Sequence, residues 1–73
     1  MKEAIEYLIE QYKQKEKDCD TLLSVIAKRI TEYRRSGDEI SIQTQRREQA
    51  ILFAQRQAYV QARADIDSLI DYL

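Results

Sequence analysis

The chain has 73 residues and a formal net charge of −1, from 12 basic and 13 acidic side chains, so bulk charge argues neither for nor against a nucleic-acid partner. With no histidine and a single cysteine, Cys19, it lacks the residues for a disulfide framework or a structural zinc site. The unpaired cysteine favours a reducing compartment, and the longest apolar run, residues 50–54, is too short to span a membrane; we therefore expect a cytoplasmic protein with no membrane partner.

The first half of the chain has an apolar stripe at helical spacing, which predicts a helix over about residues 2–35. The stripe alternates three- and four-residue steps, with one shifted step before the last two members: Ile5, Leu8, Tyr12, Lys15, Cys19, Leu22, Ile26, Ile30 and Tyr33. Ile9, Leu23 and Ala27 widen it. Lys15 is expected to pack its stem and extend its ammonium into water. A cap at Asp18, Asp20 or Thr21 would divide this helix, but the unbroken phase through Cys19 favours a single one.

Gly37, the only glycine of a chain without proline, lies at the midpoint and predicts a turn over about residues 36–40. Asp38 or Ser41 is the expected cap of the second helix, which we place at about residues 41–72. Residues 39–45 alternate apolar and polar side chains as a strand does. No second strand is available to pair with them, so we expect a helix start or a loop.

The second half predicts a helix whose main apolar face would pack on the first. That face consists of Ile51, Gln55, Ala58, Ala62, Ile66, Leu69 and Leu73, flanked by Leu52, Tyr59 and Ile70. The predicted fold is a single all-α domain over residues 1–73, a coiled-coil-like antiparallel two-helix hairpin. Because a lone hairpin buries one stripe per helix, we expect a homodimer that forms a four-helix bundle. One continuous helix through the turn would instead give a swapped dimer.

A second apolar ridge on the latter helix is expected to lie away from the main face. Its residues are Ile42, Phe53, Val60 and Ala64. Such a ridge is typical of an interface, here with a second copy of the chain or with another protein. Tyr7, which lies off the seam of the first helix, is another interface candidate.

Charge is distributed unevenly along the predicted rod. A basic tip at the turn consists of Arg34, Arg35, Arg46 and Arg47, and an acidic end at the C-terminus consists of Asp65, Asp67 and Asp71. Antiparallel docking of two rods would bring unlike ends together. The alternative function is a nucleic-acid or phosphate-ligand binder that uses the basic tip, although interleaved acids dilute the patch and no aromatic platform accompanies it. Asp67 and Asp71, four residues apart, are too few ligands for a metal site.

The sequence contains no constellation expected of a catalyst. A two-helix rod forms grooves more readily than enclosed pockets, and no residue is placed to activate Cys19, which we expect in the core. We therefore expect a non-catalytic protein without cofactor or metal. Its function would be protein–protein interaction, as an adaptor or inhibitor that occupies a partner's surface, together with self-association; nucleic acid is disfavoured as a partner.

Overall fold

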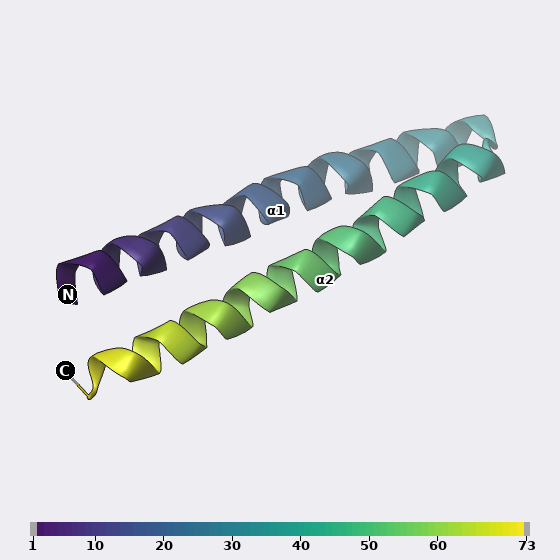
Figure 1. The fold of residues 1–73 in the computed structure, drawn as a ribbon. Coiled ribbons are helices and arrows are strands. Elements are labelled where there is room, and N and C mark those ends of the chain that lie inside the picture. The colour runs from purple at the N-terminus through teal and green to yellow at the C-terminus, as the bar shows by residue number, and fades with distance from the viewer. Residues whose placement is uncertain (1, 73) are drawn as a thin grey trace.

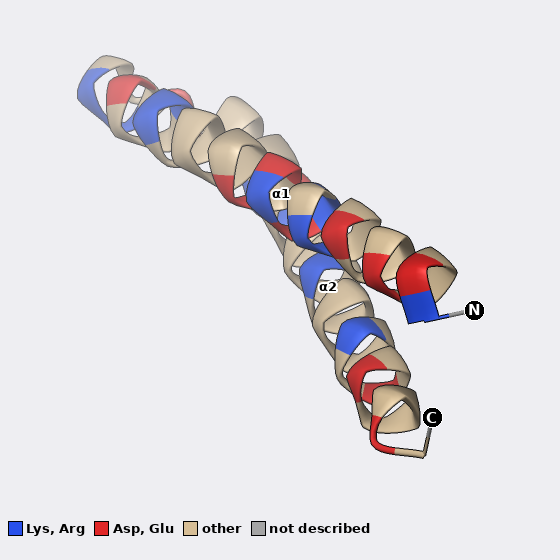
Figure 2. Ribbon diagram, turned by 90° about the vertical axis from the view of Figure 1, so that its left-hand side faces the viewer, with Lys and Arg blue, Asp and Glu red and all other residues tan. Residues whose placement is uncertain are grey.

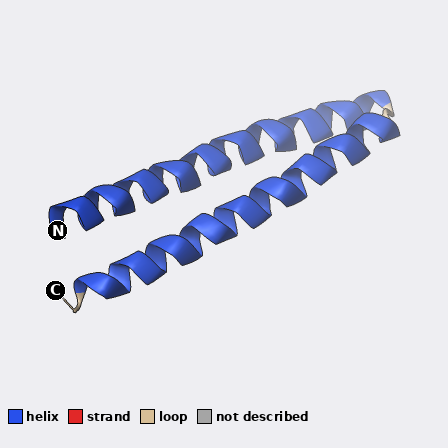
Figure 3. Ribbon diagram, viewed as in Figure 1, coloured by secondary structure: helices blue, strands red, loops and turns tan. Residues whose placement is uncertain are grey.

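The computed structural model describes residues 2–72, which form two long antiparallel helices joined by a short turn (Figure 1). Helix α1 spans Lys2–Ser36 and helix α2 spans Glu39–Ile70. No strand occurs in residues 2–72, and loop residues lie only at the turn and after α2 (Figure 3). The Cα atoms extend over 55 × 14 × 12 Å. The expectation of an all-α helical hairpin is confirmed.

The turn is built from Gly37 and Asp38. Gly37 has a φ of +73°, the left-handed conformation that a residue without Cβ adopts at least cost. Its N–H donates to the carbonyl of Arg34 (3.3 Å), and the N–H of Asp38 donates to the carbonyl of Tyr33 (3.0 Å). This hydrogen-bonding pattern is that of a Schellman motif. The carboxylate of Asp38 then caps α2 by accepting from the N–H of Ser41 (3.1 Å).

Both helices are continuous. Helix α1 runs without a break through Asp18, Asp20 and Thr21, so the alternative of two shorter helices does not describe the structure. Helix α2 begins at Glu39, which makes the strand-like segment of residues 39–45 part of its first turns. Leu73, which was expected on the main face of this helix, lies outside the described residues.

The seam that α1 presents to α2 is shifted from the predicted one at three positions. It keeps an unbroken alternation of four- and three-residue steps through Ile5, Ile9, Tyr12, Glu16, Cys19, Leu23, Ile26, Ile30 and Tyr33, all buried or half-buried. Leu8, Lys15 and Leu22, which the sequence assigned to this seam, are exposed. The sequence offers two adjacent apolar stripes, and the stripe through Glu16 packs inward because a cation on α2 faces it.

The seam of α2 differs more widely from the predicted face. It consists of Ile42, Gln45, Gln49, Leu52, Arg56, Tyr59, Arg63, Ile66 and Ile70, again at alternating three- and four-residue steps. Ile51, Gln55, Ala58 and Leu69 are exposed, contrary to expectation. Four polar residues in the true seam concealed it from a reading based on apolar periodicity alone.

The core is small and concentrated toward the turn. Ile26, Ile30 and Ile42 form its buried cluster, with Tyr33 and Leu52 packed against them. Ile42 is 3% exposed, so its expected place on a separate ridge is wrong. Among the described residues no side chain is less than 2% exposed, which shows how little two helices alone can enclose.

Candidate interaction surfaces

An ion pair occupies the seam where a pure coiled coil would place apolar side chains. Arg63 donates from Nε to Oε2 of Glu16 at 2.6 Å and from Nη2 to Oε1 at 3.2 Å. The Glu16 side chain is 11% exposed and the Arg63 side chain 30% exposed. The hydrogen bond to Glu16 raises the pKa of the Arg63 guanidinium above its ordinary value. Planar two-point contact of this kind fixes geometry, and here it fixes the relative level of the two helices.

A second interhelical ion pair lies nearer the turn end, one helical turn along α1 and two along α2. Arg56 donates from Nε to Oδ1 of Asp20 at 2.6 Å, and this hydrogen bond raises the pKa of Arg56. Near the free end the rings of Tyr12 and Tyr59 contact each other with centroids 6.1 Å apart. The ammonium of Lys15 lies 5.6 Å from the Tyr59 ring centroid. Lys15 is thus exposed, as expected for its head, but belongs beside the seam and not in it.

One side of the hairpin carries most of the exposed aliphatic side chains. We call it the groove face and define it by Leu8, Leu22, Val25, Ile51 and Leu69, which are 39–59% exposed. On α1, Leu8 and Leu22 lie 14 residues apart and Val25 lies one turn after Leu22; on α2, Ile51 and Leu69 lie 18 residues, or about five turns, apart. Each set therefore follows one side of its helix, beside the seam.

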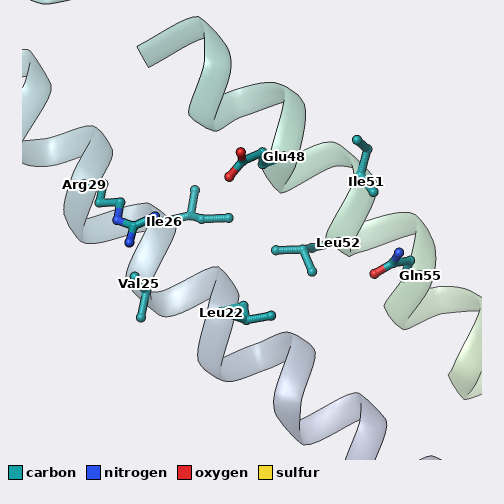
Figure 4. A pocket seen from close by; sticks show the side chains of 8 residues that line it. All are labelled: Leu22, Val25, Ile26, Arg29, Glu48, Ile51, Leu52 and Gln55. Carbon is teal, nitrogen blue, oxygen red and sulfur yellow. The ribbon is translucent and has the colours of Figure 1, made fainter. Parts of the chain in front are cut away.

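A groove of about 330 Å³ lies at the centre of the groove face. It is lined by Leu22, Val25, Ile26, Arg29, Glu48, Ile51, Leu52 and Gln55. Figure 4 shows Ile26 and Leu52 pointing toward one another from the two helices, with Leu22 and Ile51 on the flanks. Arg29 and Glu48 border the groove on opposite helices. The groove is therefore an apolar trough with one residue of each charge beside it.

The opposite side of the hairpin carries the remainder of the expected ridge. Phe53 is 55% exposed, Val60 is half-buried and Ala64 is exposed. Without Ile42, these three residues still share one side of α2, because they lie seven and four residues apart. We call this side of the molecule the Phe53 face.

The basic tip divides into two pairs. Arg34 and Arg46 come together from the two helices and line a hollow of about 470 Å³ on the Phe53 face, with Ala27, Ile30, Thr31 and Gln49. Arg35 and Arg47, each one residue further along, are exposed and do not line this hollow. Only two of the four expected arginines thus share a concave surface.

The three carboxylates of the acidic end do not converge on one site. Asp67 lies 3.9 Å from Nη1 of Arg63, and Asp65 accepts a hydrogen bond from Gln61 at 3.0 Å. Asp71 is the C-cap residue of α2, and the N–H of the next residue, Tyr72, donates to the carbonyl of Leu69 at 3.1 Å. Red bands gather toward the two chain ends in Figure 2, whereas blue bands occur along the rod and at the turn end. The three carboxylates thus make this end of the rod negatively charged without forming a single binding site.

Sequence reasoning missed the groove because it assigned Leu22, Ile51 and Gln55, which line it, to the packed faces of the two helices. A usable signal was present: the apolar stripe of α1 is wider than a two-helix seam needs, since Leu8 and Ile9, and likewise Leu22 and Leu23, are adjacent pairs. A stripe of this width is typical of a helix that contacts more than one neighbour.

Metal sites and membrane-spanning helices are two further possibilities for the described residues. Residues 2–72 contain no group of three or more acidic or cysteine side chains arranged to hold a metal ion. Neither α1 nor α2, as far as the structure describes them, combines the length and apolar character needed to cross a membrane. Comparison with protein-family models, curated proteins and solved structures finds no match to this chain. The two faces of the hairpin are therefore the candidate functional surfaces.

Proposed function

We propose that this chain is a non-catalytic, cytoplasmic interaction protein. In this proposal the hairpin self-associates as a four-helix bundle and presents the groove face to an apolar helix of another protein, as an adaptor or inhibitor does. The observation that carries the proposal is the groove face itself, where five large aliphatic side chains are exposed and three of them, Leu22, Val25 and Ile51, line an open apolar trough. Contiguous exposed apolar surface on a small protein is typical of an interaction site.

The dimensions of the groove favour a helix as the occupant. Two parallel walls of side chains, from α1 and α2, form a trough along the rod, and an amphipathic helix can place residues at three- and four-residue spacing into such a trough. Arg29 and Glu48 on its two borders would orient that helix by pairing with side chains of opposite charge. The polar seam supports the proposal as well, because the two helices bury little apolar surface between them and further apolar contacts with a partner would stabilise the hairpin.

The test is native mass spectrometry of protein purified gently from its own source. The wild type is expected to carry a second kind of chain, and Leu22→Asp combined with Ile51→Asp should lose it. Ile40→Asp is the matched control, since Ile40 is 81% exposed and lies outside both faces. A partner that survives the double substitution, or a wild type without any second chain, would contradict the proposal.

A second candidate function is supported by the Arg34 and Arg46 pair. Two cations on one concave surface could bind a phosphate group. Titration of a labelled oligonucleotide, and of inorganic phosphate, into wild type and Arg34→Glu/Arg46→Glu tests it. Binding that weakens steeply with salt and disappears in the variant would support this function, because phosphate contacts release counterions.

A further inference from the structure

We propose that a second copy of the chain docks on the Phe53 face in antiparallel orientation, through a second heptad seam on α2. This inference deepens the proposed self-association and rests on it, but it does not depend on the groove face. The second seam consists of Arg46, Ala50, Phe53, Gln57, Val60, Ala64 and Asp67, at alternating four- and three-residue steps. Such a repeat is the pattern by which one helix packs along another.

The second seam is separate from the one that holds the hairpin together. Six of its seven residues are exposed, and Val60 is half-buried. Phe53, next to the central Gln57, is 55% exposed, and exposed apolar side chains that follow one stripe of a helix are typical of an interface. A helix with two such seams is expected in a bundle of four helices, where each helix contacts two neighbours.

The order of residues along the second seam identifies the occupant. Read in either direction from Gln57, the seam presents a large apolar residue, then alanine, then a charge, and the two end charges are opposite. Antiparallel pairing of two copies about Gln57 therefore places Phe53 against Val60, Ala50 against Ala64, and Arg46 against Asp67. Parallel pairing would place Arg46 against Arg46 and Asp67 against Asp67, which repel.

The two ends of the corresponding stripe on helix α1 carry opposite charges at equal distances from the same level of the rod. Asp20 contacts Arg56, which adjoins Gln57, so these residues mark one level on the two helices. On α1, Glu6 and Arg34 lie at equal distances on either side of Asp20 and on its stripe, at multiples of seven residues. A two-fold axis through this level brings Glu6 of one copy to Arg34 of the other while it pairs Arg46 with Asp67. The Asp20–Arg56 pair is neutral as a unit, so two copies near the axis add no net charge.

The basic hollow on the Phe53 face supports the same arrangement. Arg34 and Arg46 line this hollow, and neither forms an ion pair within residues 2–72. Docking of a second copy would supply Glu6 and Asp67 as their counter-ions. The charge asymmetry of the rod agrees, because each basic turn end would lie beside an acidic free end (Figure 2).

The groove face is not self-complementary about this level. A two-fold axis on the groove face at this level would place Leu8 opposite Glu32 and Leu22 opposite Asp18, which would bury carboxylates against leucine side chains. An axis along the rod would instead bring two basic turn ends together. The Phe53 face therefore fits a second copy, and the groove face is left for another protein.

The test is the dimer dissociation constant, measured by sedimentation equilibrium, for Arg46→Glu, Asp67→Arg and the two combined. Each single change converts two symmetry-related attractions into repulsions and should weaken the dimer about tenfold or more. The combined variant exchanges the charges within the seam and should return the constant to within about threefold of wild type, since unlike charges again meet. Arg47→Glu, the same charge change on the outer side, is the control and should have little effect.

Cysteine cross-linking reports the orientation independently. Gln57→Cys lies at the axis and should form an intermolecular disulfide on oxidation, whereas Ala50→Cys and Ala64→Cys should cross-link only when mixed. Cys19 is 5% exposed and does not compete. In a parallel dimer each variant would cross-link to itself, which would overturn the proposed orientation.

The outcomes separate this inference from the wider proposal. A dimer that ignores all the charge changes and Phe53→Asp/Val60→Asp, but dissociates with Leu22→Asp/Ile51→Asp, would show that copies meet through the groove face. A protein that stays monomeric at every concentration would overturn self-association altogether. If the wild type carries no foreign partner but the Arg46 and Asp67 variants change the dimer dissociation constant as expected, the groove proposal is contradicted and the antiparallel dimer is supported.

Discussion

At the scale of single residues, the turn depends on the backbone conformation of Gly37. A Cβ added there would meet no atom within 4 Å, so any cost of substitution comes from the left-handed φ of +73° and not from crowding. We expect Gly37→Ala to lower the free energy of unfolding by about 1 kcal/mol, and Gly37→Asn to lower it less. Urea unfolding followed by circular dichroism measures both. An alanine variant as stable as wild type would contradict the argument.

Asp38 gives the turn a dependence on pH. The hydrogen bond from the Ser41 hydroxyl, and then that from the Ser41 N–H, hold the pKa of Asp38 below its ordinary value. Because the folded pKa is lower than the unfolded one, the cap stabilises fully above the unfolded pKa and is lost as pH falls through the folded pKa.

Asp38→Asn should remove this dependence, since asparagine caps helices but does not titrate in this range. The measurement is the difference in melting temperature between wild type and the variant from neutral pH to strongly acidic pH. The advantage of wild type is expected to shrink as the solution becomes acidic. A difference that stays constant over the whole range would show that the carboxylate charge contributes nothing to the cap.

At the scale of the helices, the Glu16–Arg63 pair sets the relative level of α1 and α2 more than it adds stability. Replacing a mostly buried ion pair by apolar residues of similar volume is often neutral or stabilising, whereas removal of one partner leaves a charge without compensation. We therefore expect Glu16→Leu to melt below wild type, and Glu16→Leu/Arg63→Leu to melt at or above it. Thermal unfolding at low protein concentration tests both variants. A double variant that melts below the single one would mean that the pair stabilises the hairpin outright.

The helices and the turn could be predicted from the sequence, because they depend on local signals. One glycine at the midpoint, an aspartate behind it and no proline leave few alternatives to a hairpin. The seam could not be predicted in the same way. Its polar members, such as Glu16, Arg56 and Arg63, are stabilised by partners on the other helix, and apolar periodicity gives them no weight.

The same limit applies to the candidate surfaces. Phe53 and Val60 were predicted as surface residues because they lie off the most apolar stripe. Ile42 was placed with them wrongly, since it belongs to a stripe whose next members are Gln49 and Arg56. Leu22 and Ile51 were predicted in the interior because they are apolar. Only the pairing of the helices distinguishes such residues from those that are truly buried.

At the scale of the whole molecule, the hairpin is a rod with two unlike sides. The Phe53 face has charges and apolar residues in an order that fits a second copy, and the groove face has apolar residues around a trough that does not. The core between them is small and lies mainly toward the turn. A hairpin of this composition is expected to gain much of its stability from association.

The most direct test of this proposal is the mass of the wild-type protein, produced alone without any partner, measured by native mass spectrometry across a range of concentrations at low and moderate salt. We predict a species of twice the 8.7 kDa chain mass, with a melting temperature that rises with protein concentration. The dimer should survive moderate salt, because Phe53 and Val60 on either side of Gln57 contribute apolar contacts that salt does not screen. A mass of one chain at every concentration, with a constant melting temperature, would contradict the central claim that the hairpin is completed by a second copy.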